Sequence, residues 1–178
     1  MKTKLILTLA CAVLSVVSCE KKQTEATESS AVAKPSLEKF FSEEAIADAE
    51  AIHLVKAKAK PGDEVVLSGQ VMGREKVFVD GRASFILGDP EKLTSCDRIP
   101  GDACSTPWDA CCDAKELKLE NTASIQIVGE NGRVLEGGLK GVNGLEELSH
   151  VTIRGVVAAQ SSAESLLVNA TQIHVSEE

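Results

Sequence analysis

The chain has 178 residues, which is enough for one folded domain and an N-terminal appendage. Its hydrophobic fraction is 43%, but only 3% of the residues are aromatic and tyrosine is absent, so aliphatic side chains must fill the core. The formal net charge is −8, and removing the two lysines of the first eighteen residues, which contain no acid, leaves −10. Because nucleic acids are bound largely through Lys and Arg, this charge argues against a nucleic-acid-binding protein.

The first nineteen residues have the three regions of a secretory signal peptide. A basic start is followed by an apolar run, Leu5–Val17, and then by small Ser18 and Cys19. The run is too short to span a bilayer permanently. This ending resembles the lipobox of bacterial lipoproteins, in which the peptide is cleaved before the cysteine and the sulfur carries a diacylglyceryl group. The resemblance implies that residues 1–18 are a lipoprotein signal peptide and that Cys19 is lipidated. A general signal peptide with an incidental cysteine is the alternative.

The resemblance also implies a bacterial envelope protein that is anchored to a membrane by its lipid and faces the periplasm or the cell surface. Glu20 follows the cysteine, whereas an Asp there favours inner-membrane retention in the enteric lipoproteins, so we expect the outer membrane. Residues 19–36 are rich in Ser, Thr, Glu and Lys and show no apolar period. Such a segment cannot bury enough apolar surface to offset its ordering entropy, so we expect a disordered tether.

An N-terminal helix is predicted within residues 37–62, over about 43–59. Ser42 with two glutamates after it is typical of a helix start, since the hydroxyl can cap the helix and acids favour the positive end of its dipole. Apolar residues then recur at steps of three or four, and the pair Pro61-Gly62 marks the end.

From Asp63 onward the apolar period is that of a strand, with every second residue apolar. Asp80-Gly81 and Asn131-Gly132 are typical of tight turns. In the last segment the alternation slips by one residue after Ala170, as a β-bulge requires. The five predicted strands are Glu64–Gly73, Arg82–Leu87, Ala123–Val128, His150–Ala159 and Leu166–Val175.

These segments resemble the strands of the OB fold, with EVVLSGQVMG first, ASFILGD second, HVTIRGVVAA later and LLVNATQIHV last. The likeness is to OB domains of the polymerase and synthetase anticodon-binding type, and it covers about Asp63–Val175. It implies a mainly β fold, with a five-stranded OB-fold-like barrel over residues 63–176. Another small β-barrel or a β-sandwich is the alternative, because any such fold alternates in this way.

The outward-facing positions of these strands do not favour the nucleic-acid binding of many OB folds. Such binding uses stacking aromatic side chains and a basic groove. The outward positions include no aromatic residue and one cation, so we expect no nucleic-acid partner. These positions are Ser68, Gln70, Met72, Ser84, Thr152 and Arg154.

A cysteine-rich insert, residues 90–118, lies between the second and third predicted strands. Its four cysteines are Cys96, Cys104, Cys111 and Cys112. Behind a signal peptide, an even number of cysteines favours disulfide bonds. Adjacent cysteines would form a strained ring, so Cys111 and Cys112 are predicted to pair with Cys96 and Cys104, in one order or the other. Each bridge would contribute about 2–4 kcal/mol of stability.

The insert also contains the run Thr106–Cys112, TPWDACC. It resembles a group of bacterial lipoproteins without an assigned function, in which an OB domain carries a TPWD-x-CC insert. Trp108, with Pro107 and Asp109 beside it, is the candidate contact for a protein partner, because an exposed aromatic side chain on a rigid loop often anchors one. The alternative is that Trp108 packs across a disulfide as the insert's own small core.

Metal and redox chemistry are the other possibilities for the insert. Four thiolates can bind zinc, although the usual C-x2-C knuckle is missing. The insert's acids, Asp97, Asp102, Asp109 and Asp113, lack the alternating spacing of a calcium loop. A redox cysteine favours a C-x-x-C motif, which is also absent.

The chain has no recognisable catalytic motif and implies no cofactor. His53, His150 and His174 share no spacing, and neither G-x-S-x-G nor H-E-x-x-H occurs. The sequence therefore predicts a lipid-anchored extracytoplasmic OB-fold module with a non-catalytic binding or structural role. The alternative function is a metal-binding or redox envelope protein that works through the four cysteines of the insert.

Overall fold

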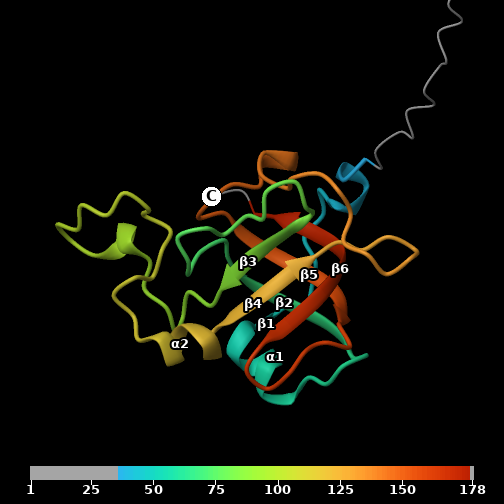
Figure 1. Cartoon of the computed structure of the whole chain (residues 1–178), viewed down its shortest axis with the longest axis horizontal. Coiled ribbons are helices and arrows are strands. Elements are labelled where there is room, and N and C mark those ends of the chain that lie inside the picture. Colours follow the sequence, from blue (N-terminus) through green and yellow to red (C-terminus); the bar gives the residue numbers. More distant parts are fainter. Residues whose placement is uncertain (1–35, 177–178) are drawn as a thin grey trace, which may run out of the picture. The chain divides into compact units, whose positions relative to one another are not determined.

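The computed structural model describes residues 36–176, and in this range the protein is mainly β, with a closed five-stranded barrel (Figure 1). The signal peptide, Cys19 and the tether up to residue 35 lie outside the described residues, so the predictions about them stay predictions. The barrel strands are β2 (Glu64–Gln70), β3 (Ser84–Gly88), β4 (Thr122–Gln126), β5 (His150–Val157) and β6 (Leu166–Val175).

The strand order confirms the predicted OB-fold-like barrel. The order is β1-β2-β3-β4-β6-β5, and pairing of β2 with β5 closes the sheet on itself. Within the barrel, β4 and β6 run parallel and all other pairs are antiparallel. The short strand β1 (Glu50–Ala51) adds to β2 in parallel, outside the five barrel strands.

Alternating side chains fill the barrel as the period of two predicts. Along β5, residues Val151, Ile153, Gly155 and Val157 are buried, and the residues between them are half-buried or exposed. Gly155 permits a close approach of β5 to β6, because a Cβ atom there would lie 2.5 Å from the carbonyl oxygen of Asn169.

The predicted β-bulge is also present. Gly155 pairs with Ala170 and Arg154 pairs with Gln172, so Thr171 of β6 is the additional residue. This extra residue moves Ile173 back to the buried face, which explains the slip in the apolar alternation.

The prediction for the N-terminal helix was wrong in its first half. Helix α1 spans only Ile52–Lys58, so it begins nine residues later than predicted. The Ser42 hydroxyl donates to the carbonyl oxygen of Glu44, and the Ser42 amide donates to the carbonyl oxygen of Ile173 at 2.8 Å. Asp48 has a positive φ of 63°, which is incompatible with a continuous helix. The Ser42 hydroxyl therefore donates to a carbonyl oxygen instead of accepting from helix amides, and its backbone is bound to β6.

The insert lies between β3 and β4, as predicted, and extends to one side of the barrel (Figure 1). It contains the 3-10 helix η2 (Cys96–Arg98), and helix α2 (Lys115–Glu120) leads into β4. The structure also has two short 3-10 helices, η1 (Glu38–Phe40) and η3 (Val142–Gly144). Among residues 36–176, no helix is long and apolar enough to cross a bilayer.

Two apolar clusters stabilise the domain. The larger one fills the barrel and includes residues of every barrel strand. The smaller one consists of Met72, Leu93 and Ala110, with Trp108 and Leu117 packed against it. The insert therefore shares a small apolar centre with Met72 of the segment that follows β2.

Candidate functional site

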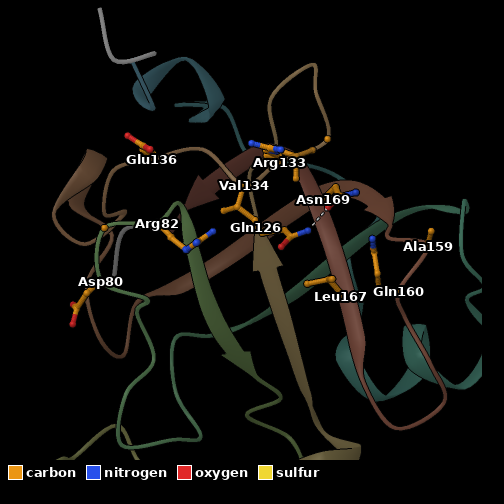
Figure 2. A pocket seen from close by; sticks show the side chains of 13 residues that line it. Asp80, Arg82, Gln126, Arg133, Val134, Glu136, Ala159, Gln160, Leu167 and Asn169 are labelled. Carbon is orange, nitrogen blue, oxygen red and sulfur yellow. Dashed lines mark hydrogen bonds between the residues drawn. The ribbon is translucent and has the colours of Figure 1, made fainter. Parts of the chain in front are cut away.

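A groove of about 830 Å³ lies where three loops of the barrel meet (Figure 2). One wall is the segment Asp80–Arg82, between β2 and β3. A second wall comes from the loop that follows β4, and a third from Ala159 and Gln160, between β5 and β6. Gln126 at the end of β4 and Asn169 in β6 lie between these walls, so strands and loops together form the site.

Two tight turns hold the walls of the groove. Gly81 has a φ of 68° and Gly132 a φ of 72°, which confirms the predicted turns at Asp80-Gly81 and Asn131-Gly132. The amide of Gly129 donates to the carbonyl oxygen of Arg133 at 2.9 Å. The amide of Val79 donates to the carbonyl oxygen of Ser84 at 3.0 Å. Arg82 and Arg133 therefore project from hydrogen-bonded hairpins.

The lining of the groove mixes polar and apolar side chains, and its charges balance. Within residues 36–176, neither arginine forms an ion pair with an acid of the lining. The side-chain Nε2 of Gln126 donates to Oδ1 of Asn169 at 2.7 Å, and Figure 2 shows this bond between β4 and β6. The polar lining residues are the cations Arg82 and Arg133, the acids Asp80 and Glu136, and the amides Gln126, Gln160 and Asn169.

Three of the four insert cysteines form a second cluster. The sulfurs of Cys96, Cys104 and Cys111 all lie within 4.8 Å of one another, and Cys112 is not a member of this set. The Cys96 and Cys111 sulfurs are 3.3 Å apart, and the Cys111 and Cys112 sulfurs are 3.9 Å apart. All four cysteines are free thiols here, so the two disulfide bonds stay a prediction.

The three clustered thiols have different acidities. Burial raises the pKa of Cys96 to about 12. Hydrogen bonding with the Thr106 hydroxyl lowers the pKa of Cys104 below its ordinary value. The hydrogen bond with Cys96 lowers the pKa of Cys111, but contact with Cys112, burial and the nearby Cys104 together raise it. Cys104 is therefore the most acidic thiol of the three.

Trp108 fastens the insert to the barrel. Its half-buried ring packs against both apolar clusters, and its Nε1 donates to the carbonyl oxygen of Glu75 at 3.0 Å. The amide of Gly73 donates to the carbonyl oxygen of Trp108 at 2.9 Å. These contacts give the side chain an internal role, and its predicted contact with a protein partner stays a prediction.

Pro107 and Asp109 also contribute to the internal structure of the insert. The amide of Cys96 donates to the carbonyl oxygen of Asp109 at 2.8 Å, and the amide of Asp97 donates to that of Pro107 at 3.0 Å. Among the described residues, the buried Oδ1 of Asp109 has no hydrogen-bond partner. The role of both residues in partner binding stays a prediction too.

A buried carboxylate, Asp89, joins helix α1 to the end of β3. Its Oδ2 accepts hydrogen bonds from the amide and from Nδ1 of His53, at 2.9 and 2.7 Å, and its Oδ1 accepts one from the amide of Glu91 at 3.0 Å. Asp89 caps the N-terminus of α1 in place of the predicted Ser42. Although His53, Asp89 and Glu91 lie close together, the hydrogen bonds of Asp89 explain the cluster as structural.

Sequence reasoning missed the groove, because its residues come from loops far apart in the chain. The available signal was an arginine beside each of the two predicted turns. Comparison of the chain with models of protein families, with curated proteins and with solved structures gave no match.

Proposed function

We propose that this protein is a lipid-anchored extracytoplasmic binding module that holds a polar ligand in the groove formed by its barrel loops. The observation that carries the proposal is the lining of the groove, which contains three side-chain amides and two arginines that form no ion pair within residues 36–176. Arginine and amide groups form directional hydrogen bonds with polar ligands.

The position of the groove supports ligand binding. In OB folds, the loops between strands one and two and between strands four and five flank the face that binds oligonucleotides or oligosaccharides. Here Asp80–Arg82 lies between the first and second barrel strands, and Ala159 and Gln160 lie between the fourth and fifth. The groove thus lies beside the same two loops, and its strand residues come from β4 and β6.

The chemistry of the groove favours an oligosaccharide. The described residues that line it include no aromatic side chain for base stacking, and its two cations are matched by two acids. A neutral ligand rich in hydroxyl and amide groups matches this lining.

The anchor rests on the N-terminal sequence. The basic start, the apolar run and Cys19 support lipidation, and the polar segment after it would connect the lipid to the barrel. Metabolic labelling with a radioactive fatty acid tests this part. The native chain should incorporate label and Cys19→Ala should not, whereas equal labelling of both would contradict the anchor.

Isothermal titration calorimetry with a neutral tetramer of N-acetylglucosamine tests the groove. Arg82→Ala and Gln126→Ala should each weaken binding, because each removes hydrogen-bond donors from the lining. Arg154→Ala is the matched control, since Arg154 is an exposed arginine of β5 outside the groove. Absence of binding at millimolar sugar, or equal loss in all three variants, would contradict the proposal.

A further inference from the structure

The three clustered sulfurs come from separate points of the insert. Cys96 begins the 3-10 helix η2, Cys104 lies in the loop after it, and Cys111 follows the turn that contains Trp108. Their convergence within 4.8 Å therefore requires the whole insert to fold back on itself.

Backbone hydrogen bonds join the segments of the insert that carry these cysteines. The amides of Cys96 and Asp97 donate to the carbonyl oxygens of Asp109 and Pro107, which ties the first cysteine to the segment just before Cys111. The amide of Cys104 donates to Oδ1 of Asp102 at 2.9 Å. The thiol positions are thus set by the fold.

The side chain of Arg98 reinforces the first part of the insert. Its Nη1 donates to the carbonyl oxygen of Pro90 at 3.2 Å, its Nε contacts the Ser95 hydroxyl at 3.2 Å, and its Nη2 contacts the carbonyl oxygen of Leu93. The guanidinium group is therefore engaged by the loop itself.

The distances between the sulfurs fit three ligands of one metal ion better than they fit two disulfide bonds. Three sulfurs lie within 4.8 Å of one another, and Cys112, whose sulfur is 3.9 Å from that of Cys111, is not part of this set. Sulfurs about 2.3 Å from one tetrahedral zinc ion lie about 3.8 Å apart. The separation of 3.3 Å between the Cys96 and Cys111 sulfurs exceeds a disulfide bond of about 2.0 Å and approaches this value.

We propose that Cys96, Cys104 and Cys111 bind one thiophilic metal ion, of which Zn²⁺ is the representative, with solvent in the fourth position. Thiolates are the ligands that soft and borderline ions prefer. Cys96 is buried, whereas Cys111 is exposed, so the site has a closed base and an open side through which an ion can enter. Binding deprotonates the three thiols and releases their protons to solvent.

Cobalt is a suitable probe, because thiolate ligation gives Co²⁺ an intense charge-transfer absorption. The full chain is purified in detergent, reduced, freed of metal and titrated with Co²⁺ and then Zn²⁺. One Co²⁺ should bind per chain with thiolate absorption, and one equivalent of Zn²⁺ should displace it. A chain that takes up neither ion at micromolar concentration would overturn the proposal.

Serine substitutions assign the ligands. Cys104→Ser and Cys111→Ser should each weaken Zn²⁺ binding by at least about tenfold, the loss that removal of even an outer-sphere partner causes. Cys96→Ser should do the same, and circular dichroism checks its fold because Cys96 is buried. Cys112→Ser is the matched control and should leave the affinity nearly unchanged. An equal loss in Cys112→Ser, or unchanged affinity in Cys104→Ser and Cys111→Ser, would overturn the assignment.

Discussion

Replacement of Trp108 tests whether this side chain stabilises the fold. The ring packs against both apolar clusters and Nε1 donates to the carbonyl oxygen of Glu75. Truncation of a fully buried Trp to Ala costs about 3–5 kcal/mol, so the half-buried Trp108 should lose about 2–3 kcal/mol in Trp108→Ala. Trp108→Phe keeps an aromatic ring but loses the hydrogen bond and part of the indole contacts, so it should lose less, about 1–2 kcal/mol.

Urea unfolding followed by far-ultraviolet circular dichroism measures these losses, because Trp108 is the chain's only tryptophan and its fluorescence disappears with it. Both variants should keep a cooperative transition, with the midpoint of Trp108→Ala clearly below that of Trp108→Phe. An internal role for Trp108 is refuted if the free energy of unfolding of Trp108→Ala lies within about 0.5 kcal/mol of the native value, the range typical of surface substitutions. That result would instead favour the exposed partner contact predicted from the sequence.

Three further predictions concern the barrel, the cap of α1 and the thiols. Gly155→Ala should lower the free energy of unfolding by about 1–3 kcal/mol, because its Cβ would lie 2.5 Å from a carbonyl oxygen of β6. Gly138→Ala is the control and should leave the free energy of unfolding nearly unchanged, because a Cβ there would meet open space. Asp89→Asn should cost about 1–3 kcal/mol in the same assay, because the buried carboxylate accepts three hydrogen bonds, and an unchanged midpoint would refute its capping role. In reduced, metal-free protein at neutral pH, iodoacetamide should alkylate Cys104 before Cys96, because the lower pKa gives Cys104 more thiolate; peptide mass spectrometry showing the reverse order would contradict this.

The barrel was predictable because its strands carry their own signal. Every second residue is apolar where one face is buried, and the slip after Ala170 marks the bulge at Thr171. The turns at Gly81 and Gly132 were predictable for a similar reason, since Asp-Gly and Asn-Gly pairs favour positive φ. These features depend on neighbours in the chain.

Features that depend on distant residues were not predictable in this way. The start of α1 is capped by Asp89, 36 residues beyond His53, while the sheet holds Ser42. The groove combines residues from three loops, and the sulfur cluster depends on how the insert folds back. Cysteine spacing by itself indicated pairs, whereas the fold brings Cys96, Cys104 and Cys111 together as a set of three.

A crystal structure of the Cys19→Ala chain with the N-acetylglucosamine tetramer tests the proposed binding role most directly. The account predicts sugar density in the groove, with hydroxyl or acetamide groups within hydrogen-bond distance of Arg82, Gln126 or Arg133. Sugar bound elsewhere on the barrel, or an empty groove at saturating sugar with these side chains accessible in the lattice, would contradict it.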